Sequence, residues 1–315
     1  MNKQYDRSAE DLGNIVGLEH VNLQIDDQGV ATLFYISGLG LTRDPFMMTS
    51  IDNMWVNVGR SQFHLITGMP QHLRGRVGLV VPDRAGLLRR LENLRKPLKG
   101  TKFDFTEHND HVEAICPWGN HFLCHDPAPR FGRINLGMPY VEFDVPVGAA
   151  KGVADFYARV FGAATKVDGT AARVSAGMEQ ELVFRETKAK LGPYDGHHIQ
   201  VYVANFSGPH RELLERGLIT EESNQHQYRF DSIVDLKNGK PLIQIEHEVR
   251  SMRHPLYARP LVNRNAQQTN RNYAPGYDAF IPGAEAEEMD DPRYAMRQRR
   301  MENVTPQGTA RRRAG

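Results

Sequence analysis

The sequence predicts an α+β fold in which four βαβββ modules pair into two half-barrel domains. Two observations carry this prediction. One strand, one short helix and then three further strands recur in the same order along the chain. The motifs of the first half also return about 120 residues later, which indicates an internal duplication. A chain of 315 residues has room for two domains of ordinary size.

The module pattern is clearest at its first occurrence. The segment GLEHVNLQIDD alternates apolar and polar residues, as a strand does, and QGVATLFYISGLGL follows with helical spacing and ends in glycines. Three short segments rich in strand-forming residues come next. The second, third and fourth modules begin at GRVGLVVPD, PYVEFDVPV and HHIQVYVANF.

The duplication is visible in residues that keep nearly the same offset. These are His20 with Tyr140, Arg76 with His198, and Phe34-Tyr35 with Phe156-Tyr157. We therefore expect modules one and two to form one half-barrel and modules three and four the other. The predicted organisation is a flexible N-terminus (1–14), a first domain (15–130), a second domain (135–250), an ordered strap (251–283) and a disordered tail (284–315).

Composition narrows the class of protein. The net charge of +1 gives no overall field that favours nucleic acid or anionic lipid, so no specific nucleic-acid partner is expected. No apolar run suits a signal peptide or a membrane span, and we expect a cytoplasmic protein. The two cysteines do not form a CxxC pair, which argues against a disulfide framework. Phosphate-binding glycine loops, nucleophile elbows and dinucleotide fingerprints are absent from the sequence.

The segments EHVNLQIDD…LFYISGLGL, YVEFDVPV…DFYARVFGA, HHIQVYVA and LIQIEHE resemble the vicinal oxygen chelate superfamily. That superfamily includes glyoxalase I, extradiol dioxygenases and bleomycin-binding proteins. The resemblance covers roughly residues 15 to 250, and four modules in one chain look most like the two-barrel extradiol dioxygenases. It implies paired modules that form a cup, with residues of first and fourth strands pointing inward to hold a divalent metal.

Position by position, the resemblance implies a site in the second half of the chain. His198, Glu246 and Glu181 are the expected metal ligands, while Tyr140 and Glu181 are expected to act in catalysis. Imidazole and carboxylate ligands suit Fe(II) or Mn(II), which we favour, and also Zn(II) or Ni(II). Tyr140 stands where the ring-cleaving enzymes place their first histidine ligand, which argues against iron-dependent ring cleavage.

Strand alternation selects the residues that point inward. Glu246 shares a face with Gln244, opposite Ile245 and His247, so Glu246 faces the cup if the apolar residues face the helices. Glu248 lies on the same side as Glu246, which also permits an exposed outer face. His197 and His198 point to opposite faces, and therefore at most one of them enters the cup.

The first half offers His20, His64 and Arg76 as a substrate pocket. Two histidines and an arginine make a poor cation site and a better pocket for an anion or polar ligand, because the guanidinium charge is permanent. Leu123 or Cys124 stands where a carboxylate would be needed. Both histidines could equally be hydrogen-bonded interior residues. Four further histidines gather in module two, but their spacing matches no structural zinc pattern: His108, His111, His121 and His125.

Two classes of function remain. The first is a divalent-metal-dependent enzyme that acts on a small substrate with vicinal oxygens, with dioxygenase chemistry ahead of glyoxalase-like isomerase or lyase chemistry. The second is a metal-free small-molecule binding or sequestration protein, which the substitution at Tyr140 favours. A small-molecule partner is expected in both classes, no membrane partner is expected, and assembly into a homo-oligomer stays open.

Overall fold

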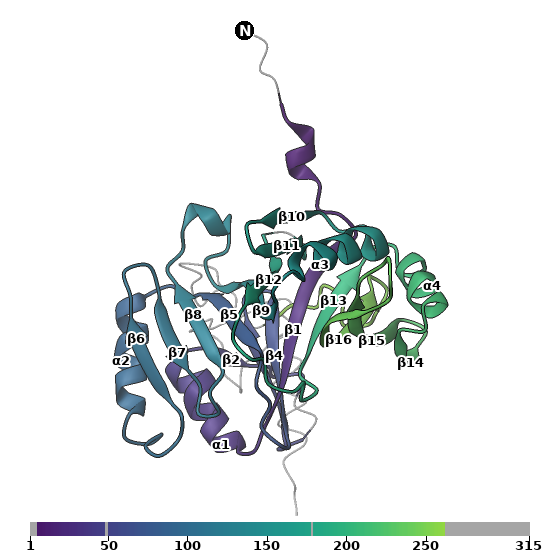
Figure 1. Cartoon of the computed structure of the whole chain (residues 1–315). Coiled ribbons are helices and arrows are strands. Elements are labelled where there is room, and N and C mark those ends of the chain that lie inside the picture. The colour runs from purple at the N-terminus through teal and green to yellow at the C-terminus, as the bar shows by residue number, and fades with distance from the viewer. Residues whose placement is uncertain (1–4, 48–49, 178, 262–315) are drawn as a thin grey trace, which may run out of the picture. The chain divides into compact units, whose positions relative to one another are not determined.

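The computed structural model describes residues 5–47, 50–177 and 179–261. It contains the four βαβββ modules that the sequence predicts (Figure 1). A short 3₁₀ turn, η1 (Arg7–Glu10), precedes the first module. Each module then has one strand, a helical segment and three more strands. The predicted strap is described only as far as Leu261, and the predicted tail lies outside the described residues.

Modules one and two occupy the first half of the chain. The elements of module one are β1 (Ile15–Ile25), α1 (Gln28–Ala31), the π-helical η2 (Thr32–Gly38), β2 (Thr42–Arg43), β3 (Asn53–Val58) and β4 (Ser61–Thr67). Those of module two are β5 (Gly75–Val80), α2 (Arg84–Leu94), β6 (Asp104–Glu107), β7 (Val112–Ile115) and β8 (His121–His125).

A 3₁₀ turn, η3 (Pro129–Phe131), leads into the second half. Module three contains β9 (Gly137–Pro146), α3 (Ala150–Phe156), the π-helical η4 (Tyr157–Phe161), β10 (Thr165–Asp168), β11 (Ala171–Ser175) and β12 (Glu181–Thr187). Module four contains β13 (His198–Val203), α4 (Ser207–Glu215), β14 (Ile219–Asn224), β15 (Gln227–Val234) and β16 (Pro241–Ser251).

The strands form two eight-stranded sheets, and the pairing of modules differs from the expectation. One sheet has the order β14-β15-β16-β13-β1-β4-β3-β2 and joins module one to module four. The other has the order β10-β11-β12-β9-β5-β8-β7-β6 and joins module two to module three. The expectation that modules one and two form one half-barrel and modules three and four the other was therefore wrong.

The physical reason lies in the repeat itself. The duplication makes module three equivalent to module one, and module four equivalent to module two. A sheet built from modules one and four has the same composition of repeat units as one built from modules three and two. The offset of about 120 residues therefore fits both pairings equally well. Antiparallel pairing of β1 with β13 and of β5 with β9 decides between them.

Helical aromatic residues fill the space between the sheets. Tyr35 of η2 packs against Phe63 of one sheet and Phe122 of the other, with ring centroids 5.3 and 5.7 Å apart. In module three, Tyr157 packs against Phe184 and donates a hydrogen bond to the buried His247 of β16. The repeated Phe-Tyr pair of the sequence is thus core that links the two sheets.

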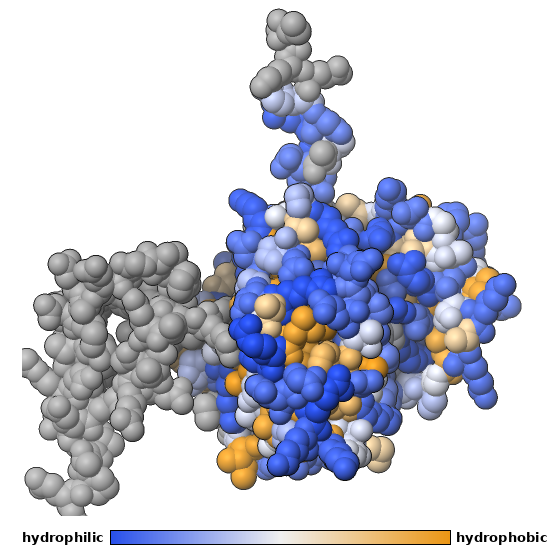
Figure 2. All heavy atoms as spheres, turned by 90° about the vertical axis from the view of Figure 1, so that its left-hand side faces the viewer, coloured by the Kyte–Doolittle hydropathy of each residue, from blue (hydrophilic) through white to orange (hydrophobic). Residues whose placement is uncertain are grey.

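Polar residues dominate the face of the molecule that Figure 2 shows. Figure 2 shows a face on which hydrophilic residues surround smaller hydrophobic patches. None of the helices in the described ranges has the length and hydropathy that crossing a bilayer requires.

Candidate metal centre

The candidate site lies on the inward face of the sheet that joins modules one and four, here called the 1/4 cup. In its centre, β1 pairs antiparallel with β13, so that His20 is opposite Gln200 and Asn22 is opposite His198. On the other side of β13, the parallel β16 places Glu246 beside His198. Alternation along each strand directs these polar side chains to one face while apolar neighbours enter the core.

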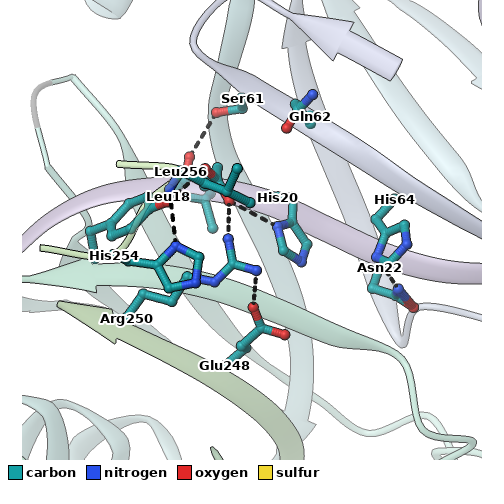
Figure 3. Close-up of polar contacts among 12 residues, drawn as sticks. Leu18, His20, Asn22, Ser61, Gln62, His64, Glu248, Arg250, His254 and Leu256 are labelled. Carbon is teal, nitrogen blue, oxygen red and sulfur yellow. Dashed lines mark hydrogen bonds and ion pairs between the residues drawn. The ribbon is translucent and has the colours of Figure 1, made fainter. Parts of the chain in front are cut away.

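Three of these residues bring ligand atoms together. One nitrogen each of His20 and His198 and one carboxylate oxygen of Glu248 all lie within 4.8 Å of one another. The three residues are 1%, 7% and 3% exposed, so water competes little for them. Figure 3 shows His20 and Glu248 approaching the same region, with the Arg250 guanidinium beside them in contact with Glu248.

A β-bulge in β1 lies directly before His20. Between Leu18 and His20 the register against β13 advances by one residue fewer than on β1, which leaves Glu19 as the extra residue. Bulges re-aim side chains and are frequent beside active sites. As a result Glu19 and His20, although adjacent in sequence, contact one another, with Glu19 Oε2 3.2 Å from His20 Nδ1.

Carboxylates also orient both histidines. Nδ1 of His20 donates to Glu19, and Nδ1 of His198 lies 3.4 Å from Glu246 Oε1. Such contacts select the tautomer in which Nε2 carries the free lone pair, as is usual for metal-ligating histidines. Neither Nε2 atom has a hydrogen-bond partner among the described residues.

Burial keeps these imidazoles neutral. It lowers the pKa of His20 and of His198 well below 6.5, and nearby Arg229 and other positive groups lower it further. A neutral imidazole is the form that binds a metal. Burial also raises the pKa of Glu248, and the guanidinium groups of Arg250 and Arg229 oppose that rise by favouring the carboxylate.

Two arginines hold Glu248 in place. Nη2 of Arg229 donates to its Oε2 at 2.5 Å, and Nη2 of Arg250 lies 2.5 Å from its Oε1. Arg250 thus binds Oε1 through a short ion pair. Arg250 also donates to Glu19 at 2.8 Å, and Arg229 donates to Glu246 at 2.6 Å. These charges orient the carboxylate and favour its ionised form.

An aromatic wall closes one side of the 1/4 cup. The His64 ring stacks on Trp55 with centroids 3.8 Å apart, and Trp55 meets His20 edge to face at 5.0 Å. Both nitrogens of His64 are hydrogen-bonded, Nδ1 to the amide of Asn22 and Nε2 to Asn53. Burial lowers the pKa of His64 to about 2. His64 is therefore a neutral part of the wall whose ring nitrogens are already used.

The donor set fits a divalent ion. Two neutral imidazoles with unpartnered Nε2 atoms and one carboxylate, all buried, form the two-histidine, one-carboxylate combination of non-haem iron oxygenases. Glu19 and Glu246 would then act as outer carboxylates that orient the ligands.

Comparison with known proteins identifies the fold. No family model matches the chain, and no curated protein matches it in sequence. Among solved structures, a Bacillus subtilis protein provisionally named a dioxygenase is similar, with a TM-score of 0.52 and 16% identity, over 93% of this chain and 97% of that one. A mutant glyoxalase I from Zea mays matches with a TM-score of 0.50 and 12% identity, over 75% of this chain and 92% of that one.

The chain has the vicinal oxygen chelate fold. At these identities the comparison establishes architecture, and the chemistry has to come from the residues of the site.

Within this vicinal oxygen chelate fold, the predicted site residues separate into two groups. His198 and Glu246 lie together, 3.4 Å apart, in the 1/4 cup. Tyr140 and Glu181 lie on β9 and β12, which belong to the other sheet. There Tyr140 is hydrogen-bonded to His125 at 2.9 Å, and Glu181 accepts from Arg173 at 2.7 Å. Grouping all four in one site was wrong, and its cause is the wrong pairing of modules.

The first-half pocket of His20, His64 and Arg76 is divided in the same way. His20 and His64 line the 1/4 cup, whereas Arg76 lies in the other sheet, 3.2 Å from Glu142. Sequence reasoning placed His20 in a half without the main metal and passed over Glu19 and Glu248. A usable signal for Glu248 was present, since it shares a strand face with Glu246.

The inward face of the sheet that joins modules two and three, here called the 2/3 cup, carries different residues at equivalent positions. Tyr140 faces Gly78 across the central strand pair as His20 faces Gln200, and Arg76 stands where His198 does. Leu123 pairs with Gly78 as Glu248 pairs with Gln200.

A second group of potential ligands lies at the edge of the 2/3 cup, formed by Asp110, His111 and His125. Asp110 is exposed, and both nitrogens of His125 already have partners in Asp110, Tyr140 and Arg130. This group does not share the unpartnered, buried nitrogens of the 1/4 cup, so we do not assign a metal to it.

Proposed function

We propose that the protein is a divalent-metal-dependent enzyme of the dioxygenase type, with the metal held by His20, His198 and Glu248. One observation carries the proposal: three buried ligand atoms converge within 4.8 Å, and both histidine Nε2 atoms lack hydrogen-bond partners. A buried polar atom without a partner costs free energy, so a ligand that uses it is favoured. Fe(II) or Mn(II) suits this donor set best.

When bound, the metal would polarise two adjacent oxygens of a small substrate and, as Fe(II), position dioxygen beside it. The chain's own residues prepare the site. Glu19 accepts a hydrogen bond from Nδ1 of His20, and Glu246 Oε1 lies 3.4 Å from Nδ1 of His198, so both carboxylates favour the tautomer with a free Nε2 lone pair. Trp55 and His64 present a flat, neutral surface against which a planar substrate can pack.

The charges of the 1/4 cup favour a substrate that reacts in a partly anionic form. Arg229 and Arg250 remain beside Glu248, and both are permanently charged. Their fixed positive charge stabilises negative charge that develops on an oxygen near Glu248. Such charge develops when a vicinal diol or an α-hydroxy carbonyl loses a proton.

A metal-free binding protein is the second candidate. The observation that favours it is the double ion pair of Glu248 with Arg229 and Arg250, which already neutralises this carboxylate without a metal. In that case the cup would hold an organic ligand against Trp55 and His64 without turnover.

Metal analysis of the protein purified without chelator separates the two candidates. Near-stoichiometric metal in the wild type, lost in His198→Ala, supports the enzyme. Glu181→Gln is the matched control, because Glu181 lies in the other sheet and should leave the metal content unchanged. Oxygen consumption by the Fe(II)-loaded protein with a panel of catechols then tests the dioxygenase assignment. A metal-free wild type that does not bind added Fe(II) or Mn(II) would exclude it.

A further inference from the structure

Gln200 is a buried polar residue whose amide is explained neither by contacts within the fold nor by a role as a proposed metal ligand. It is 0% exposed, and neither its amide nitrogen nor its amide oxygen has a hydrogen-bond partner. Among the residues that the structure describes, no other side chain has two buried polar atoms in this state. An unpaired buried amide destabilises a protein, so its presence calls for a ligand.

The register places Gln200 in the middle of the candidate metal centre. It pairs with His20 of β1 on one side and with Glu248 of β16 on the other. On its own strand, His198 lies two residues away and therefore points to the same face. The three proposed metal ligands, His20, His198 and Glu248, are thus all neighbours of Gln200 in the sheet.

The 2/3 cup shows that this fold does not require a side chain at the position. The equivalent residue there is Gly78, opposite Tyr140. A Cβ atom added to Gly78 would lie 2.3 Å from the Tyr140 ring, so the tyrosine ring fills this space in the 2/3 cup. In the 1/4 cup the amide side chain of Gln200 occupies the equivalent position. The difference between the two cups is therefore chemical and not architectural.

We propose that Gln200 is a specificity residue that binds the small molecule on the metal, and this inference rests on the proposed function. A primary amide offers a donor and an acceptor side by side. It can accept from a hydroxyl group and donate to an adjacent oxyanion at the same time. Gln200 therefore selects ligands that retain one hydroxyl next to the oxygen bound by the metal.

The matched control is Gln62, which is also buried and is the neighbour of His20 on β4. Its amide nitrogen donates to Asp44 at 3.0 Å and to Asn57 at 2.6 Å, away from the three ligands. In Figure 3 it lies on the strand above His20, apart from Glu248. Gln62→Met removes a buried amide of the same size without touching the proposed contact.

The experiment measures Mn(II) affinity and then the affinity of the Mn(II)-loaded protein for 4-nitrocatechol and for its monomethyl ether. For Gln200→Met we expect an unchanged Mn(II) affinity and 4-nitrocatechol binding that is weaker by about ten-fold. The preference of the wild type for 4-nitrocatechol over the ether should shrink by a similar factor. Gln62→Met should keep both ligand properties. Gln200→Leu serves as a second variant of different shape, should Gln200→Met not fold.

Each other outcome overturns the inference. Loss of Mn(II) binding in both Gln200 variants would make Gln200 a metal ligand, and unchanged 4-nitrocatechol affinity would make it a structural residue. In both cases the proposed function survives. A Mn(II)-loaded wild type that does not bind 4-nitrocatechol would overturn the inference and the vicinal-oxygen substrate together. A wild type that does not bind Mn(II) or Fe(II) would overturn the proposed function itself.

Discussion

The two cups of this protein have the same strand arrangement and different chemistry. In the 1/4 cup, His20, His198 and Glu248 converge with unpartnered nitrogen atoms. In the 2/3 cup, Tyr140 and Arg76 occupy the two histidine positions, and both are bonded to protein neighbours. Duplication supplied the same framework twice, and the two copies differ in the three side chains that form the candidate metal centre.

Ion pairs between its own side chains stabilise the 2/3 cup. Glu142 is almost buried and accepts from Arg185 at 2.9 Å, with Arg76 at 3.2 Å. Hydrogen bonding to Glu142 raises the pKa of Arg185. These ion pairs join Glu142 to two arginines, although Nε of Arg76 has no hydrogen-bond partner. The comparison teaches that the two cups differ in residue types at equivalent positions: two histidines and a glutamate in the 1/4 cup, and a tyrosine, an arginine and a leucine in the 2/3 cup.

The largest effect should come from removing a ligand in the 1/4 cup. Glu248→Gln keeps the shape of the side chain and removes its charge, so we expect Mn(II) affinity to fall by more than about 100-fold. Isothermal titration calorimetry of wild type and variant measures it. Glu142→Gln in the 2/3 cup is the matched control and should leave the Mn(II) affinity unchanged. A loss of affinity in this variant would contradict the assignment, because it would place the metal in the 2/3 cup.

The next effect concerns the carboxylate behind His20. Glu19→Gln removes the charge that orients the imidazole, and we expect Mn(II) affinity to fall by about 10- to 100-fold. The electron paramagnetic resonance spectrum of bound Mn(II) should also change, because the His20 ligand loses basicity. Equal affinities for variant and wild type would show that Tyr202 and Arg250 hold the site without Glu19.

The comparison can also be reversed by transplanting the three ligands. In a Glu248→Gln background, Tyr140→His, Arg76→His and Leu123→Glu together reproduce the ligand set in the 2/3 cup. We expect Mn(II) binding at least about ten-fold above that background, weaker than the wild type because no outer carboxylate was added. Absence of any gain in calorimetry would mean that the ligand set alone does not make the site.

Acid should weaken the sheet of modules one and four, which contains His247. Burial lowers the folded-state pKa of His247 to about 4, whereas the unfolded chain titrates near 6.5. Below pH 6.5 the unfolded state therefore binds a proton that the folded state does not. The contribution of His247 to stability is complete above pH 6.5 and decreases by about 3 kcal/mol as the pH falls to 4.

Urea denaturation at pH 7.5 and pH 4.5 measures this decrease. His247→Gln should reduce the difference between the two pH values, because it removes the titrating group. His121→Gln, at an exposed position of the other sheet, should retain the full difference. An unaltered pH difference in His247→Gln would assign the acid sensitivity to other groups.

The smallest effect should come from the 2/3 cup. Tyr140→Phe removes the hydrogen bond to His125 and retains the ring that packs on Gly78. We expect a loss of about 1 kcal/mol in the free energy of unfolding and no change in Mn(II) affinity. Thermal denaturation and calorimetry check both. A fall in metal affinity would give Tyr140 the role that the sequence first suggested.

Sequence reasoning reached the module order and the faces of individual strands. The number of modules follows from periodicity, which is a local property of side chains. Alternation within single strands likewise selected His198 over His197 and Glu246 over His247. His247 does enter the core, where it stacks on Phe230 with centroids 4.4 Å apart. These features depend on residues close together in the chain.

Tertiary structure alone decided which modules share a sheet, and with that which residues share a site. His20 and Glu248 are brought together only through the pairing of β1 with β13 and of β13 with β16. Local periodicity carries no information on such contacts, because each module offers the same strand edges to several partners. The bulge at Glu19 depends on that pairing as well, since a bulge exists only against a partner strand. The sequence thus determined the units and their inward residues, and long-range strand pairing brought together the residues of the candidate metal centre.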